Sequence, residues 1–155
     1  MATTQEEADT IIIRQVSFLT DGTAIVVADD TDIFLLLLHF CNLKNIACRV
    51  LMKSPISGRA VIDIAATVEK HKGIIPNLLA AHALTGCDTV ASTFGIGKAT
   101  GLKVLRSGKH ELNMLGNIGN NIASFSGVLD QAASFLLACY GQSKCVSLTE
   151  ARQKS

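Results

Sequence analysis

The sequence lacks an excess of either charge, because 14 Lys and Arg residues face 13 Asp and Glu residues and the net charge is +1. Any affinity for nucleic acid must therefore come from a local basic patch. Paired cysteines are also missing: the chain has five cysteines, an odd number, and no Cys-x-x-Cys spacing. This pattern argues against a disulfide framework and against a zinc site. We expect reduced thiols and an intracellular location.

Long apolar runs are absent as well. The most apolar stretch, 33–41, is interrupted by His39 and falls far short of the roughly 20 residues that cross a bilayer. Residues 1–9 are polar and acidic, so we expect neither a secretory signal nor a membrane partner. No internal repeat or low-complexity segment is present. With 155 residues, 48% of them apolar, the chain can bury the core of one domain, 1–155.

Apolar periodicity, caps and turn residues predict a helix that begins at the Thr4 capping box and ends at Asp21-Gly22. A fully apolar strand follows at 24–28, and extended segments are predicted at 47–52 and 60–64. Further helices are predicted at 32–43, 63–72, 76–84, 98–105 and 122–140, with a short turn at 111–115 and a frayed tail at 147–155.

The predicted fold class is α/β. Strand 24–28 is apolar on both faces, which is typical of a central strand in a parallel sheet with flanking helices on either side. From residue 86 onwards the sequence is purely helical in pattern. We therefore predict a parallel sheet with flanking helices, followed by a helical hairpin subregion at 76–107 and C-terminal helices.

Three carboxylates follow strand 24–28 at its carboxyl end: Asp29, Asp30 and Asp32. Ligands bind at this end of the strands in open α/β sheets. Three clustered acids repel one another unless something offsets the charge, and a divalent cation such as Mg²⁺ or Mn²⁺ is the simplest candidate. The alternative is structural, because Asp30 or Asp32 could cap the helix that follows.

Two more acidic sites lie elsewhere in the sequence. Glu6, Glu7 and Asp9 open the first helix, where acids also favour the helix dipole. Asp88 follows the predicted helix 76–84, where an Asp can equally be a turn residue. Taken alone, each of these positions has an ordinary structural interpretation.

A glycine loop, Phe94-Gly95-Ile96-Gly97-Lys98, joins two predicted helices. It is a poor phosphate-binding P-loop, since Ala99 stands in place of Ser or Thr and no strand precedes it. It fits better the turn of a helix-hairpin-helix, whose backbone N–H groups contact nucleic-acid phosphates. Local positive charge is available from Lys98, Lys103, Arg106 and Lys109. A helical hairpin that binds no ligand is the alternative.

In combination, these motifs resemble the PIN-like domain of flap endonucleases and XPG-type 5′-nucleases. The resemblance covers roughly residues 5–107. Within this range, the amino-acid sequence of the motifs is similar to that of an animal branch of the superfamily. It rests on four motifs in the family's order and near its spacing: Glu7-Ala8-Asp9, Ala28-Asp29-Asp30-Thr31-Asp32, Leu84-Thr85-Gly86-Cys87-Asp88 and Gly95-Ile96-Gly97-Lys98.

The resemblance implies roles for individual residues. Two divalent ions, Mg²⁺ or Mn²⁺, would be held by Glu7, Asp9, Asp30, Asp32 and Asp88, with Asp30 and Asp32 as the catalytic carboxylates. It also implies a monovalent-cation site for K⁺ near Ser92. The implied contacts to the DNA backbone are Gly95, Gly97, Lys98 and Lys103. In two departures from the family, Asp9 replaces a Glu and Gly101 replaces an Ala.

The family's opening strand, two further metal-binding Asp residues and its phosphate-clamping basic residues do not fit before Glu6. We therefore expect a partial or degenerate domain. The leading hypothesis is a metal-dependent, structure-specific nuclease acting on duplex or branched DNA, with a nuclear location. One alternative is a non-catalytic nucleic-acid-binding module. Another is a phosphatase with Asp30 as nucleophile and Asp32 as acid/base, in which Phe34 stands where a Thr is usual.

Overall fold

The order of helices and strands in the computed structural model follows the predicted order along residues 4–86, 96–110, 112–116 and 125–141, which are the residues described here. The chain divides into two units, Met1–Ile75 and Pro76–Ser155. The first contains α1 (Thr4–Phe18), β1 (Thr23–Val27), α2 (Thr31–Asn42), β2 (Arg49–Lys53), β3 (Ile62–Asp63) and α3 (Ile64–His71). Next come α4 (Ile75–Thr85), which starts at the boundary, α5 (Lys98–Arg106), α6 (Asn113–Gly116) and α7 (Phe125–Cys139).

The fold is mixed α/β, but the sheet is not purely parallel. β1 and β2 are parallel, with Thr23 opposite Arg49 and Val27 opposite Lys53, and α2 makes the crossover between them. β3 is antiparallel to β2, which corrects the prediction of a parallel sheet. The physical reason is the connection: residues 54–61 are too few for a crossover, and Gly58, at a φ of +85°, helps to turn the chain back.

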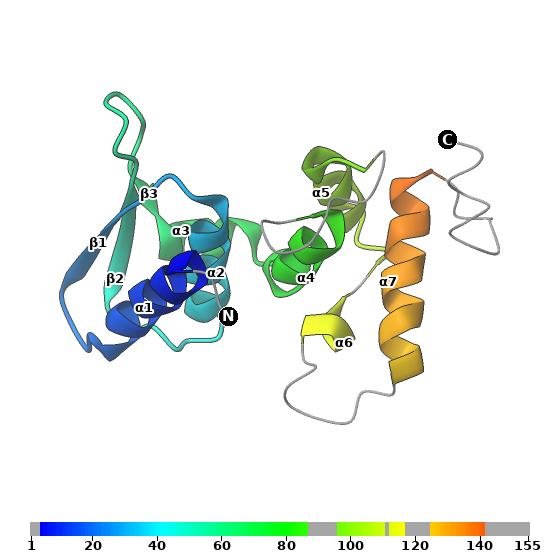
Figure 1. The fold of residues 1–155 in the computed structure, drawn as a ribbon, viewed down its shortest axis with the longest axis horizontal. Helices are drawn as coiled ribbons and strands as arrows, with labels where there is room; N and C mark the ends of the chain where they lie inside the picture. Colours follow the sequence, from blue (N-terminus) through cyan, green and yellow to red (C-terminus); the bar gives the residue numbers. More distant parts are fainter. Residues whose placement is uncertain (1–3, 87–95, 111, 117–124, 142–155) are drawn as a thin grey trace. The chain divides into compact units, whose positions relative to one another are not determined.

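The position of β1 also differs from the prediction. In the sheet order β1-β2-β3, β1 is an edge strand and not a central one. Figure 1 shows α1, α2 and α3 on one side of the three strands. Of the β1 side chains, Val26 is buried, whereas Ile25 and Val27 are 62% and 61% exposed. Apolar side chains on a strand indicate that a face can be buried, but burial also requires another segment to cover that face.

The core of the first unit is built around α2. Its side chains Ile33, Leu35, Leu37 and Leu38 are buried, as are Val50 and Met52 on β2 and Ile64 and Val68 on α3. Burial of each such side chain contributes about 1.5–3 kcal/mol relative to exposure. His39 lies within this apolar helix, and burial lowers its pKa. This layer of helices holds the parallel pair of strands from one side.

The second unit has its own helical core, in which Phe135 and Leu112 are fully buried. Here α5 packs closely on its neighbours at Gly101. A Cβ at this position would lie 3.0 Å from the Thr85 Cγ2 atom and 3.6 Å from the Phe135 ring. The Thr85 side chain is held in place because its hydroxyl donates to the Ala81 carbonyl at 2.9 Å. Close packing therefore accounts for Gly101, where the resembling family carries Ala.

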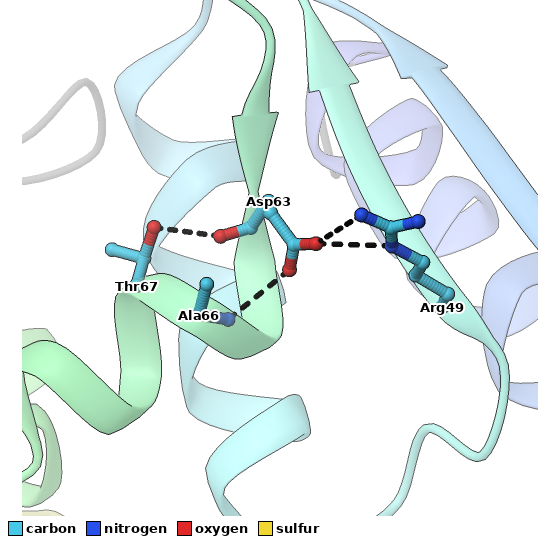
Figure 2. A network of polar contacts seen from close by, with 4 residues as sticks. All are labelled: Arg49, Asp63, Ala66 and Thr67. Carbon is cyan, nitrogen blue, oxygen red and sulfur yellow. Dashed lines mark hydrogen bonds and ion pairs between the residues drawn. The ribbon is translucent and has the colours of Figure 1, made fainter.

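Asp63 joins β2, β3 and α3 through a polar network (Figure 2). It is the N-cap of α3, where its Oδ1 atom accepts from the Ala66 amide at 3.1 Å. Its Oδ2 atom accepts from Nε and Nη2 of Arg49 at 3.0 and 2.9 Å. The Ala66 amide and then the Arg49 guanidinium lower the pKa of Asp63. One carboxylate thus anchors the first turn of a helix to the neighbouring strand.

We predict that Asp63→Asn lowers the free energy of unfolding near pH 7 and that this loss shrinks in acid. A depressed folded-state pKa stabilises the fold above the ordinary value of 3.8, and the contribution is lost as pH falls through the folded pKa. Urea unfolding of both proteins from pH 7 to pH 2 measures the difference. Arg49→Gln, which keeps the cap, should lose less than Asp63→Ala. A difference that stays constant down to pH 2 contradicts the assignment.

A second prediction concerns Gly101. Gly101→Val should destabilise the second unit by about 1–3 kcal/mol, because the added methyl groups meet Thr85 and Phe135. Ala99→Val is the matched control, since Ala99 is exposed on the same helix and the change costs only helix propensity, roughly 0.5 kcal/mol. Urea unfolding of both variants compares them. Helix propensity alone would make Gly101→Val slightly stabilising, because Gly is the poorer helix former, so a variant that loses no stability contradicts the packing explanation.

Candidate functional site

A pocket of about 220 Å³ opens at the carboxyl ends of β1 and β2. Because these strands are parallel, the residues that follow each of them meet at the same edge of the sheet. The pocket is lined by both apolar and polar residues. Its lining comprises Ala28, Phe34, Met52, Ala60 and Ile62 together with Asp29, Asp30, Thr31, Ser54 and Arg59. Carboxylates, hydroxyl groups and one guanidinium thus share a single small space.

Asp30 occupies the junction between β1 and α2. Ala28 extends the parallel ladder by donating to the Lys53 carbonyl at 3.1 Å, and the chain then turns into the helix. Asp30 is the N-cap of α2, with its Oδ1 atom accepting from the Asp32 amide at 2.7 Å. This confirms the capping interpretation for Asp30. A carboxylate has two oxygens and about four acceptor positions, so capping one amide leaves room for a further ligand.

Asp29 is paired with Arg59, which sequence reasoning did not single out. The Arg59 Nη1 atom donates to Asp29 Oδ2, and the two side chains are 56% and 35% exposed. The repulsion that suggested a metal is therefore offset at Asp29 by a cation of the protein itself. Arg59 lies 30 residues further along the chain, in the segment between β2 and β3. Only the antiparallel return of that segment brings it to Asp29.

The other predicted metal ligands are placed as follows. Asp32 lies in the first turn of α2 and is partly buried, and Asp9 is partly buried in α1. Glu7 belongs to α1, while its side chain lies outside the described part of the structure, as does all of Asp88. Within the side chains that are described, no three His, Cys, Asp or Glu residues are close enough to hold a metal ion together. The contact between Asp30 and Asp32 is a hydrogen bond from the backbone amide of Asp32 to the Asp30 carboxylate.

The predicted DNA contacts divide in a similar way. Ser92 and Gly95, and with them the hairpin turn, lie outside the described residues. Gly97 is the N-cap of α5 and has no side chain to cap the helix. Ile96 beside it is buried and anchors this end of α5 in the second unit. The predicted cations from α5 and the segment after it are all exposed: Lys98, Lys103, Arg106 and Lys109.

Charge is distributed unequally between the two units. Residues 76–155 contain seven Lys and Arg against four Asp and Glu, whereas residues 1–75 contain seven against nine. The near-neutral chain is therefore the sum of an acidic first unit and a basic second unit. The excess of positive charge in the chain thus lies in residues 76–155.

Comparisons of the chain with protein-family models, curated proteins and solved structures give no match. In the segments that the structure describes, no helix combines the length and apolarity needed to cross a bilayer. The functional interpretation therefore draws on the chain's own residues and on the motifs described above.

Proposed function

We propose that this chain is part of a PIN-like, metal-dependent, structure-specific nuclease that hydrolyses phosphodiester bonds in DNA. The observation that supports this most strongly is the placement of Asp30 and Asp32 where β1 ends and α2 begins, with Asp30 on a pocket at the ligand-binding edge of the sheet. The resemblance to flap endonuclease and XPG-type motifs supplies the reaction class.

The ligand chemistry of the pocket suits Mg²⁺ or Mn²⁺. These hard cations prefer oxygen ligands, and the pocket offers the carboxylates of Asp29 and Asp30 and the hydroxyl groups of Thr31 and Ser54. The pocket has a volume of about 220 Å³, well above the roughly 10–15 Å³ that a single water needs. Mg²⁺ usually keeps several waters and binds through one or two carboxylates, so the pocket can accept a hydrated ion. The resemblance also implies Glu7, Asp9, Asp32 and Asp88 as ligands, although Asp9, Asp30 and Asp32 do not form a group of three in the described part of the structure.

Each part of the chain has a distinct task in this proposal. Asp30 and Asp32 would hold the divalent ions, which would supply an activated water and positive charge for the phosphodiester oxygens. The Asp30 cap fixes the start of α2 relative to β1. The exposed cations Lys98 and Lys103 contact backbone phosphates, with Gly95 and Gly97 letting the backbone approach. A K⁺ ion near Ser92 would reinforce this contact.

We predict that Mg²⁺ stabilises the wild-type protein and that Asp30→Asn combined with Asp32→Asn removes this effect. A ligand at 100 times its Kd raises the free energy of unfolding by about 2.7 kcal/mol. Asn caps a helix about as well as Asp, so the double variant should fold normally without metal. Thermal unfolding over a Mg²⁺ titration measures the response.

Two single variants serve as controls for this titration. Asp21→Asn removes one charge at the other end of β1 and should respond to Mg²⁺ like the wild type. Asp30→Ala should lose about 1 kcal/mol even without metal, because the cap is lost. Unfolding of the double Asn variant, or an unchanged Mg²⁺ response, would show that these acids are structural only.

Cleavage assays with branched DNA and Mg²⁺ or Mn²⁺ separate catalysis from binding alone. Cleavage by the wild type that is absent in the double Asn variant supports the nuclease. Tight DNA binding without any cleavage would instead support the non-catalytic binding module. The binding-module alternative rests on the basic side chains of α5, which include Lys103 and Arg106.

We also predict that Lys98→Ala with Lys103→Ala weakens duplex binding by a similar factor for all sequences, because these contacts meet phosphates and not bases. Losing two phosphate contacts should reduce the slope of log K against log salt by about 2. Fluorescence anisotropy with several duplexes at several salt concentrations measures both effects. Lys70→Ala with Lys72→Ala removes two exposed charges from the first unit and should change little. A changed sequence preference would overturn the phosphate assignment.

A further inference from the structure

Arg59 reaches the pocket from a segment that no catalytic motif includes. It follows Gly58 in the connection between β2 and β3, which extends beyond the sheet in Figure 1. Its side chain lines the same pocket as Thr31 and Ser54. One guanidinium and two hydroxyl groups are hydrogen-bond donors suited to a phosphate. Against them stand the carboxylates of Asp29 and Asp30, which repel an anion.

The Arg59 ion pair differs from the other ion pair of the first unit. Arg49 binds Asp63 through two nitrogens, and Asp63 is also fixed by capping α3. Arg59 makes its contact to Asp29 through Nη1 alone. The two pairs are exposed to a similar degree, at 62% and 28% for Arg49 and Asp63 and 56% and 35% for Arg59 and Asp29, so the number of contacts and not the exposure distinguishes them. A ligand that replaces the Asp29 carboxylate on Arg59 breaks one hydrogen bond, whereas displacing Arg49 from Asp63 breaks two and disturbs a carboxylate that also caps α3.

We propose that Arg59 is a phosphate-binding residue of this pocket and that Asp29 restrains it in the absence of ligand. A phosphate takes the place of the Asp29 carboxylate on the guanidinium, whose planar donors match phosphate oxygens in pairs. Asp29 is thus an internal competitor: it keeps Arg59 at the pocket and lowers the pocket's affinity for anions. The ligand class is a phosphate group, either free or as the phosphodiester of a nucleic acid.

Divalent cations should strengthen this contact, a consequence that rests on the proposed function. A cation on Asp29 and Asp30 cancels their repulsion of the phosphate and competes with Arg59 for the Asp29 carboxylate. Cation and phosphate would then favour each other's binding, and linkage requires the effect to be reciprocal. The contact between Arg59 and phosphate does not itself depend on a metal.

The test is a calorimetric titration of the whole chain with inorganic phosphate, and separately with a deoxydinucleotide that carries one phosphodiester. Without metal, Asp29→Asn should bind phosphate at least about tenfold more tightly than the wild type, because the competitor is gone and one negative charge is removed. Arg59→Gln should abolish binding, and Arg59→Lys should keep part of it. Arg49→Gln is the matched control, since it breaks the other ion pair of the same sheet, and its affinity should equal the wild type's.

The outcomes separate this inference from the proposed function. Equal phosphate affinity in the wild type and in Arg59→Gln, with circular dichroism showing both folded, overturns the role of Arg59. So does an Asp29→Asn variant that gains no affinity. Mg²⁺ stabilisation that persists in Arg59→Gln alongside unchanged phosphate affinity supports the metal site and rejects this inference. Phosphate binding that depends on Arg59 without any Mg²⁺ response supports this inference and rejects the metal site. Dependence on Arg59 for the dinucleotide as well as for free phosphate identifies a phosphodiester as an accepted ligand.

Discussion

The parallel pairing of β1 with β2 is the constraint on which the rest of the first unit depends. Parallel strands need a crossover, and α2 provides it, so the helix must begin directly after β1. Its first turn and the ends of both strands consequently share one edge of the sheet. The buried side of α2, with Leu37 and Leu38 almost without exposure, holds this arrangement in place. The carboxylates at the edge are positioned by the backbone and by the core beneath them.

The antiparallel β3 and its connection to β2 bring further side chains to this edge of the sheet. Its connection to β2 returns Arg59 to Asp29, while Asp63, at the end of β3, binds Arg49 and caps α3. Two ion pairs on one small sheet therefore have different roles. The Arg49 pair is built into secondary structure through two guanidinium nitrogens and a helix cap. The Arg59 pair lines a pocket and uses a single guanidinium nitrogen, without a helix cap.

The second unit contributes charge and a rigid helix. The cations of α5 are exposed, while Leu105 of the same helix is buried and Gly101 packs against Thr85 and Phe135. In the proposed function each unit has a separate binding role. The first would bind divalent cations and a phosphate, and the second would bind the nucleic-acid backbone.

The sequence by itself determined the order of the elements and several of their ends. The apolar run of β1, a cap at Asp30 or Asp32 and the start of α3 after Asp63 are local features that can be read from neighbouring residues, and the structure decides the cap for Asp30. It also placed Asp30 and Asp32 at a strand end, although capping accounts for one of the two oxygens of Asp30. Only the tertiary structure decided that β1 is an edge strand, that β3 runs antiparallel and that Arg59 meets Asp29. The physical reason is that periodicity records which faces of a segment can be buried. It does not record which distant segment pairs with it, or in which direction.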